Sequence, residues 1–292
     1  MGHPAPHLKF APLLAYALGV LSLLVLLAAG ADARAQAQPA VAFVIDDMGY
    51  SLEEVEQVLA LEGPVAVAVL PDTPYAAPVA TRVGAAGREV LLHQPMAPRN
   101  GERNPGPRVL TLEMSAYELD AMLTENLARV PGAVGMNGHM GSLLTTHADV
   151  MREVMRLLRR RGDLFFVDSF THPQSVGLRQ ARRHGLLATR RDVFLDHDPR
   201  EAAVREQLDR LRRLARERGS ALAIGHPGTP TLRLLRTAIP ALREEGYRVL
   251  SVRELIALQS PQQLERGSDE VALARGVREG LVLPTEATDE RP

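Results

Sequence analysis

Short apolar runs alternate with amphipathic runs along most of this chain, and that alternation restricts the fold more than any other feature. Apolar runs that suit buried strands stand at residues 41–45, 65–70, 89–92, 133–136, 164–167, 186–188, 193–195, 221–224 and 247–250. Most of them are followed by segments whose apolar side chains have helical spacing. Repeated strand–helix units predict a parallel sheet covered by helices. About seven or eight such units in roughly 220 residues favour a closed or nearly closed (β/α) barrel over an open sheet.

Helix boundaries are marked in places by side chains that cap a helix. Ser51 is followed three residues later by Glu54, and Ser115 by Glu118, which is the spacing of a capping box. The segment 199–218 is expected to be a long helix rich in arginine and glutamate. We expect those charged side chains to form a solvated face, because an amphipathic helix turns its polar side to water.

The first part of the chain has the order of a secretory signal peptide. Residues 1–37 contain the positive charge of Lys9, then an apolar run at 10–30, then Ala-x-Ala steps that end at Ala37. We predict cleavage after Ala37 and export to the periplasm. The apolar run is about 20 residues, which is long enough to span a bilayer. The alternative is therefore an uncleaved anchor in the inner membrane, with the rest of the protein facing the periplasm.

The remainder of the chain is expected to form one domain and a tail. Residues 38–260 contain the strand–helix units, whereas 261–292 are polar and acidic without a sustained period, as in a flexible tail. The chain has no cysteine, which excludes disulfide and thiol chemistry. Its formal net charge of −1 indicates no nucleic-acid partner. Contact with a membrane is expected only through an uncleaved N-terminal segment.

Polar side chains of the types that bind metals or transfer protons directly follow most of the expected strands. They are Asp46 with Asp47, Asp72, His93, Asn137 with His139, Asp168 with Ser169, Asp196 with His197, and His226. In a (β/α) barrel the carboxyl ends of the strands meet on one rim, where the active site lies. We therefore expect these residues to form one site.

A divalent metal and a proton-transfer pair fit the residue types on this rim. Asp47, His93 and His139 could supply one carboxylate and two imidazoles, a ligand set that suits zinc and its neighbours. Asp46 could then act as the general base toward water, and His226 could protonate the leaving group. Asp168 or Asp196 could orient His226 or an arginine. Of these two, Asp168 is the predicted catalytic-site residue.

At these positions the sequence resembles a known family, the divergent polysaccharide deacetylases, which are related to carbohydrate esterases that deacetylate chitin-like chains and peptidoglycan. The resemblance rests on seven ordered stretches between about residues 41 and 232: VAFVIDDMGYS, AVLPDTPYA, LLHQPMAP, GMNGHMGS, FFVDSFT, DVFLDHD and AIGHPGTPTL. It implies a distorted (β/α) barrel of about seven parallel strands and a metal site. It further implies that Asp46 resembles the catalytic base, Asp47 a metal ligand and His226 the late histidine that serves as acid.

The sequence departs from the pattern of that wider group at three places. The group takes two metal histidines from one His-x-x-x-His segment, but no histidine stands four residues after His139. The second imidazole would have to come from His93. Ala97 stands where an acidic residue is expected, and Gly138 where a second asparagine is expected.

Three functions fit the sequence. The first is an exported, metal-dependent deacetylase that acts on an N-acetylated envelope glycan such as peptidoglycan. The second is a catalytically silent module that binds an envelope glycan or regulates a partner on the same fold, and the third is a hydrolase of another amide or ester. A base beside a metal ligand favours an enzyme, since a binding module needs none. The absence of tryptophan argues against a long glycan groove lined by aromatic rings.

Overall fold

The structure is a computed structural model that describes residues 38–99, 104–228 and 230–260, and every element named below belongs to the unit Pro39–Pro292. The predicted signal segment 1–37 and the predicted tail 261–292 lie outside the described residues. None of the helices in the described ranges is both long enough and apolar enough to cross a bilayer.

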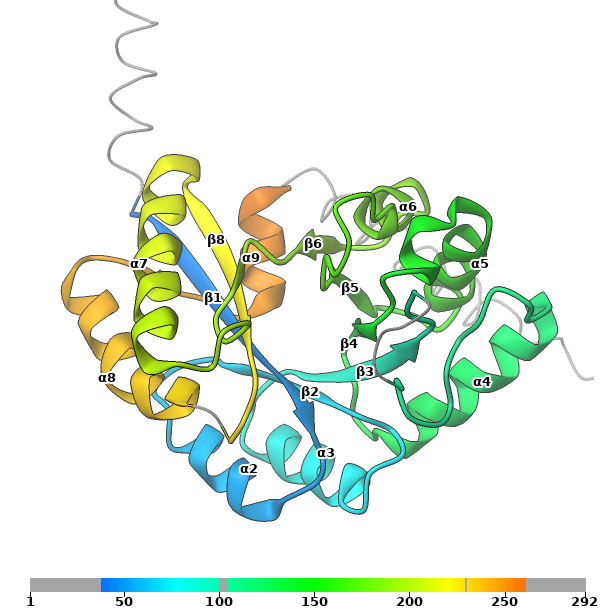
Figure 1. Ribbon diagram of the computed structural model, residues 1–292, viewed down its shortest axis with the longest axis horizontal. Coiled ribbons are helices and arrows are strands. Elements are labelled where there is room, and N and C mark those ends of the chain that lie inside the picture. The colour runs from blue at the N-terminus through cyan, green and yellow to red at the C-terminus, as the bar shows by residue number, and fades with distance from the viewer. Residues whose placement is uncertain (1–37, 100–103, 229, 261–292) are drawn as a thin grey trace, which may run out of the picture. The chain divides into compact units, whose positions relative to one another are not determined.

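The described residues form one sheet in which every strand pair is parallel. The strands are β1 (Ala40–Met48), β2 (Ala66–Val69), β3 (Val90–Met96), β4 (Gly135–Met140), β5 (Phe165–Asp168), β6 (Ala188–Arg190), β7 (Val193–Phe194), β8 (Ser220–Gly225) and β9 (Arg248–Val249). Their order is β6-β5-β4-β3-β2-β1-β8-β7, and β9 pairs with the start of β1. The sheet curves strongly, as Figure 1 shows.

Helices follow most of the strands, and those other than α9 cover the convex face of the sheet (Figure 1). They are α2 (Leu52–Leu59), α3 (Ala76–Ala85), α4 (Ala116–Arg129), α5 (Ala148–Arg159), α6 (Gly177–Arg183), α7 (Glu201–Arg218), α8 (Pro230–Glu244) and α9 (Val252–Gln259), with a 3-10 turn at Leu144–Thr146. Ser51 caps α2, and the capping box expected at Ser115 is formed at the start of α4. The alternation of strands and helices therefore gives the fold class that the sequence predicted.

The two faces of the sheet pack against different partners. Along β1, Val41, Phe43 and Ile45 belong to the large apolar cluster formed with the outer helices. The intervening residues of β1 belong to a second cluster, on the concave side, together with Val252 and Leu255 of α9. Because strand side chains alternate between faces, a strand buried on both sides is apolar throughout, which explains the unbroken apolar run at 41–45.

The barrel is distorted because its two edge strands, β6 and β7, do not pair with each other within the described residues. Only Arg191 and Asp192 separate them in the sequence. The helix α9 lies on the concave side of the sheet (Figure 1), where Gln259 bonds to both Thr189 and Ser220. Nine strands are present in the described residues rather than about seven, and two of them, β7 and β9, have only two residues each.

Four strands are longer than predicted, and three of them, β1, β3 and β4, contribute the candidate metal ligands. β1, β3 and β4 continue past their apolar runs, so that His93 pairs with Asn137 in register and Pro95 with His139. The expectation that these ligands directly follow their strands was therefore wrong: they lie within them. The backbone ladder does not require apolar side chains, provided that buried polar groups find partners.

Candidate functional site

Both carboxylates of β1 reach the same cavity because the strand is irregular near its end. The register between β1 and β2 shifts between Ile45 and Met48, and Asp47 has a left-handed backbone with φ of 57°. Such backbone strain at a non-glycine residue is costly and gathers at functional sites. The usual alternation of side chains fails here, and Asp46 and Asp47 both line a cavity of about 190 Å³.

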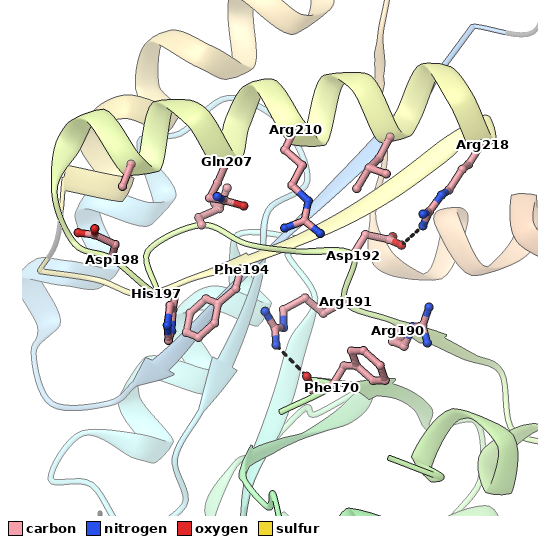
Figure 2. A pocket seen from close by; sticks show the side chains of 13 residues that line it. Phe170, Arg190, Arg191, Asp192, Phe194, His197, Asp198, Gln207, Arg210 and Arg218 are labelled. Atoms are coloured by element: carbon pink, nitrogen blue, oxygen red, sulfur yellow. Dashed lines mark hydrogen bonds and ion pairs between the residues drawn. The ribbon is translucent and has the colours of Figure 1, made fainter. Parts of the chain in front are cut away.

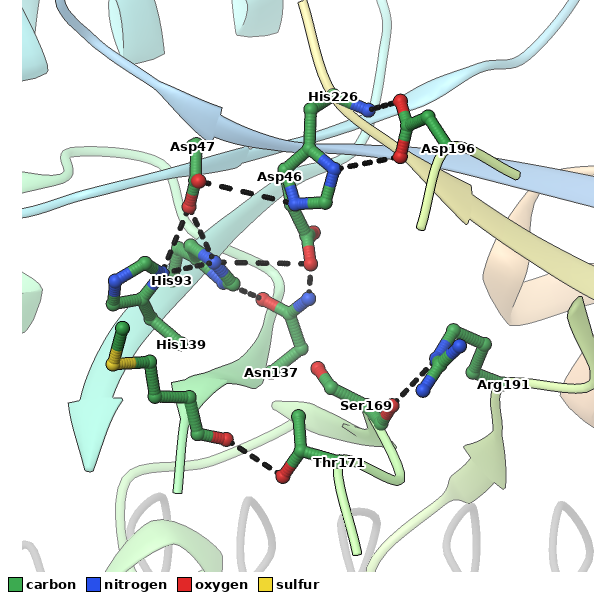
Figure 3. Close-up of polar contacts among 11 residues, drawn as sticks. Asp46, Asp47, His93, Asn137, His139, Ser169, Thr171, Arg191, Asp196 and His226 are labelled. Carbon is green, nitrogen blue, oxygen red and sulfur yellow. Dashed lines mark hydrogen bonds and ion pairs between the residues drawn. The ribbon is translucent and has the colours of Figure 1, made fainter. Parts of the chain in front are cut away.

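Three side chains from β1, β3 and β4 converge on one point of this cavity. Asp47 Oδ1 lies 3.0 Å from His93 Nε2 and 2.8 Å from His139 Nδ1. The two ring nitrogens are 3.2 Å apart, and the three candidate ligand atoms all lie within 4.8 Å of one another. Figure 3 shows the three side chains pointing toward one another. The structure thus brings together the three residues predicted as metal ligands.

The charges of this cluster fit a bound cation. Asp47 Oδ1 is buried but makes no regular hydrogen bond with any described residue. Burial opposes ionisation of Asp47, but His139 and His93 hold its pKa well below its usual range. Burial likewise opposes a charge on His93, yet Asp46 and Asp47 raise its pKa to about 9. Carboxylates that raise the pKa of a buried imidazole also favour binding of a cation. A metal ion would compete with the proton for the lone pair of the imidazole nitrogen.

Asn137 connects the metal cluster to the candidate base. Its Oδ1 lies 2.8 Å from His93 Nδ1, and its Nδ2 donates a 2.7 Å hydrogen bond to Asp46 Oδ1. The first contact places the proton of His93 on Nδ1 and leaves Nε2 free to bind a metal. The second fixes one oxygen of Asp46, whose side chain is buried. Sequence reasoning placed Asn137 on the rim but missed this role.

The candidate acid, His226, is held by Asp196 rather than by Asp168. His226 Nδ1 lies 2.9 Å from Asp196 Oδ1, and the backbone N–H of His226 donates to Oδ2 at 2.7 Å. Burial alone would lower the pKa of His226, but Asp196 raises it above its ordinary value. The other ring nitrogen, Nε2, faces the metal cluster and lies 3.8 Å from Asp47 Oδ2.

The catalytic role predicted for Asp168 stays a prediction, because the bonds of its carboxylate go to a neighbouring loop. Its carboxylate accepts hydrogen bonds from the backbone of Phe170 (2.9 Å) and Leu178 (3.0 Å) and from the hydroxyl of Ser175 (2.8 Å). These bonds shape the loop that leads into α6. The strand order explains the difference, because β5 is separated from β8 by four strands whereas β7, which precedes Asp196, pairs with β8.

Arg191 is a further residue of the cavity that sequence reasoning did not identify. Its guanidinium donates to the carbonyl oxygens of Ser169 at 2.6 Å and Phe170 at 2.9 Å, and it lines the cavity with Asp46 and His226. Burial lowers the pKa of Arg191, and the charge of Asp46 partly offsets that effect. Nothing in the dipeptide Arg190-Arg191 distinguishes the half-buried Arg191 from the exposed Arg190, so only the fold identifies it.

The arrangement combines the groups that hydrolysis of an amide or ester requires. A cluster that could hold a cation, a buried carboxylate and an oriented imidazole face one small cavity, as Figure 3 shows. A base and an acid on either side of a polarised carbonyl can activate water and protonate a leaving group.

Comparisons with known proteins identify the family that this sequence matches. The sequence profile of one family, described as divergent polysaccharide deacetylase, matches residues 43–256. The uncharacterized protein YibQ of Escherichia coli (strain K12) is 42% identical over 201 residues, covering 68% of this chain and 61% of the relative. An uncharacterized protein of Haemophilus influenzae is 35% identical over 209 residues, covering 72% and 74%. The chain thus matches less than two thirds of the length of the E. coli relative.

One solved structure shares the fold at a greater distance in sequence. It is the crystal structure of an uncharacterized protein from Agrobacterium tumefaciens C58, with a TM-score of 0.70 and 23% sequence identity. The match covers 75% of this chain and 89% of that chain.

Proposed function

This chain belongs to the divergent polysaccharide deacetylases, and on that premise we propose that it is a metal-dependent hydrolase that removes acetyl groups from an N-acetylated envelope glycan. Peptidoglycan is the first candidate substrate. The observation that carries the proposal is the convergence of Asp47, His93 and His139 beside Asp46 and His226 in one cavity. A module that only binds a glycan has no need of an oriented base and acid at a cation site.

The metal would be held by Asp47 Oδ1, His93 Nε2 and His139 Nδ1. When bound, a divalent cation supplies Lewis-acid chemistry that polarises an acetamide carbonyl and makes water easier to deprotonate. One carboxylate with two imidazoles is the donor set of zinc and its neighbours, so zinc is the metal we propose.

The chain's own residues would then move two protons. Asp46 takes a proton from the attacking water, and the hydrogen bond from Asn137 keeps its other lone pairs aimed at the cavity. His226 gives a proton from Nε2 to the departing amine nitrogen as the C–N bond breaks, so that acetate and a free amine result. Asp196 holds the imidazole at Nδ1 and favours its protonated form.

We also propose that the protein works outside the cytoplasm. The support is the apolar run at 10–30 followed by Ala-x-Ala steps, which is the order of an export signal. N-terminal sequencing of the mature protein tests this proposal, with a start at Gln38 as the expected result. An intact amino terminus on a membrane-bound protein would support the anchor instead.

The test of the deacetylase itself is release of acetate from N-acetylated glycans by the purified, zinc-loaded protein. We expect acetate from at least one envelope glycan, and loss of that activity in Asp46→Asn with metal content unchanged. A protein that retains its metal, binds glycan and releases no acetate would instead be the silent binding module, the second function that the sequence allowed.

A further inference from the structure

A second cavity, lined by arginines, adjoins the candidate active site. It has a volume of about 470 Å³ and lies between α7 and the segment that joins β6 to β7. Figure 2 shows the side chains of Arg190, Arg191, Arg210 and Arg218 around it, with the rings of Phe170 and Phe194. We call it the arginine pocket.

The pocket exists because the sheet does not close. β6 ends at Arg190 and β7 begins at Val193 on the opposite edge of the sheet. The chain crosses between the two edges with Arg191 and Asp192, and α7 covers the gap (Figure 2). We expected the charged residues of 199–218 to form a solvated face, and Arg210 and Arg218 are exposed there and also line this cavity.

The pocket carries more positive charge than its carboxylates balance. Arg218 pairs with Asp192 at 3.3 Å, and Asp198 forms its ion pair with Arg200, outside the lining. Arg210 makes no hydrogen bond or ion pair with any residue in the described ranges, and Arg190 makes no ion pair there. Burial lowers the pKa of Arg191, Asp46 and Asp168 partly raise it again, and repulsion from Arg210 lowers it. An anion bound between these guanidinium groups would relieve that repulsion.

Two of the guanidinium groups are already held in place by aromatic rings. Arg190 lies over the ring of Phe170 at 4.3 Å, and Arg191 over the ring of Phe194 at 4.6 Å. A stacked, planar guanidinium loses little freedom when it binds a carboxylate with two parallel hydrogen bonds. The pocket is thus organised before a ligand arrives.

The position of the pocket indicates which molecule carries the anionic group. Arg191 and Phe194 line both the arginine pocket and the cavity of the candidate active site, so one extended ligand can occupy both. A further hollow, lined by Arg179, Arg182 and Arg183 of α6, shares Phe170 and Arg190 with the arginine pocket. The arginine lining therefore continues away from the site, as a chain with repeated negative charges would require.

We propose that the arginine pocket binds a carboxylate of the substrate, and that the substrate is an acidic N-acetylated glycan rather than a neutral one. The proposal rests on the proposed deacetylase function and narrows its substrate class. The sugar that carries the acetamide would lie at the metal cluster, and an acidic group further along the same glycan would lie between Arg190, Arg191 and Arg210. Peptidoglycan with free carboxylates on its peptides fits this class, and a plain N-acetylglucosamine chain does not.

The experiment compares three oligosaccharides of equal length: a neutral N-acetylglucosamine oligomer, a hyaluronan oligomer with alternating glucuronate, and an N-acetylglucosamine oligomer that bears phosphate esters. Binding by titration calorimetry and acetate release are both measured, for the wild-type protein, Arg210→Gln and Arg213→Gln. Arg213 is the matched control, because it is an exposed arginine of the same helix that does not line the pocket.

We expect the wild-type protein to bind the glucuronate oligomer at least about tenfold more tightly than the neutral one, which corresponds to about 1.4 kcal/mol, because hydrogen bonds to charged groups are stronger than neutral ones. Arg210→Gln should remove most of that preference, and Arg213→Gln should retain it. Raising the salt concentration should weaken binding of the glucuronate oligomer more than binding of the neutral oligomer. Because Arg210 is exposed, its substitution should not alter the melting temperature. Equal melting temperatures of the variants would exclude misfolding as the cause of a lost preference.

Equal affinity for the neutral and the glucuronate oligomers would overturn the proposal, as would a preference that persists in Arg210→Gln. An Arg210-dependent preference for the phosphate oligomer over glucuronate would overturn the assignment of a carboxylate. If the carboxylate preference depends on Arg210 but no oligomer releases acetate, the proposed catalysis fails while the binding inference stands. If acetate is released equally from the neutral and glucuronate oligomers, the proposed function stands and the inference fails.

Discussion

The candidate site has two halves that balance their charges in different ways. In the metal cluster of Asp47, His93 and His139, three ligand atoms crowd together and a buried carboxylate oxygen lacks a regular hydrogen bond. In the pair of Asp196 and His226, both oxygens of the carboxylate are hydrogen bonded to His226, one by its backbone N–H and one by ring atom Nδ1. The first half presents one carboxylate and two imidazoles that could hold a cation, whereas the second is a closed pair.

This difference indicates separate tasks. The strained, left-handed backbone at Asp47 is costly to the folded protein, and such strain gathers at functional sites. A satisfied buried pair, in contrast, fixes the orientation and protonation of one side chain. We therefore expect substitutions in the first half to act through metal content, and substitutions in the second to act at constant metal content.

The largest effect is expected from removal of a metal ligand. His93→Ala or His139→Ala leaves two of three protein ligands, so affinity for zinc should fall by at least about 100-fold, more than loss of an outer hydrogen bond produces. Zinc content by mass spectrometry and the rise in melting temperature on adding zinc both measure this. His147→Ala is the control, because His147 is exposed and lies outside the cavity. Full metal content in His93→Ala would show that His93 is not a metal ligand and that the two halves do not differ in this way.

The next largest effect is expected from the candidate base, Asp46, which is not a metal ligand in our assignment. Asp46→Asn keeps an oxygen that can accept the hydrogen bond from Asn137, so zinc should stay bound. Removal of a general base lowers the rate by about 10²- to 10⁴-fold. Acetate release and zinc content measured on one preparation separate these results. Loss of zinc in Asp46→Asn would instead make Asp46 a ligand and move it into the metal cluster.

A smaller effect is expected in the second half. In Asp196→Asn, His226 loses the carboxylate that orients it, and acetate release should fall by about tenfold or more without loss of zinc. The pH dependence of stability checks the pair independently. Burial opposes the charge of Asp196, but His226 keeps its pKa below the usual value. A lowered pKa contributes stability above the unfolded value of about 4, and that contribution is lost as the pH falls further.

The wild-type protein should therefore exceed Asp196→Asn in unfolding free energy at neutral pH, and the excess should shrink on acidification below about pH 4. Urea denaturation at several pH values measures it. An excess that grows toward acid would show that the pair does not hold a charged carboxylate.

The sequence predicted the fold and the rim residues because both depend on local patterns. Alternating strands and helices imply a parallel sheet, and polar residues after apolar runs imply a rim. Which rim residues contact one another depends on the order of the strands in the sheet, and no local sequence pattern predicts that order. Asp168 and Asp196 both follow apolar runs and look equivalent in the sequence, but only Asp196 lies on a strand connection next to β8.

Backbone irregularity and long-range contacts account for the rest of what sequence reasoning missed. The left-handed turn at Asp47 brings both acids of β1 to one cavity, although their adjacency alone predicts opposite faces. Asn137 contacts both His93 and Asp46 only because β3, β4 and β1 curve around the same space. The arginine pocket arises where the sheet stays open, which a count of strands does not reveal.

The smallest effect on catalysis is expected from Asp168, whose three hydrogen bonds all serve the loop before α6. In Asp168→Asn, an amide N–H₂ group replaces one acceptor and meets backbone N–H donors, so a buried donor is left without a partner. We expect a loss of about 1–3 kcal/mol in unfolding free energy, measured by urea denaturation. Zinc content should not change, and the kcat of the folded fraction should stay within a few-fold of wild type.

The close packing around Asp168 explains why the loop cannot adjust to that change. A Cβ at Gly177 would lie 2.8 Å from Asp168 Oδ2, so the loop backbone is already in contact with the carboxylate. The control is Asp149→Asn on α5, because that carboxylate is mostly exposed and its loss should alter stability little. A large fall in kcat with unchanged stability in Asp168→Asn would support the catalytic role predicted for Asp168 and show that loop position and proton transfer are linked across both halves.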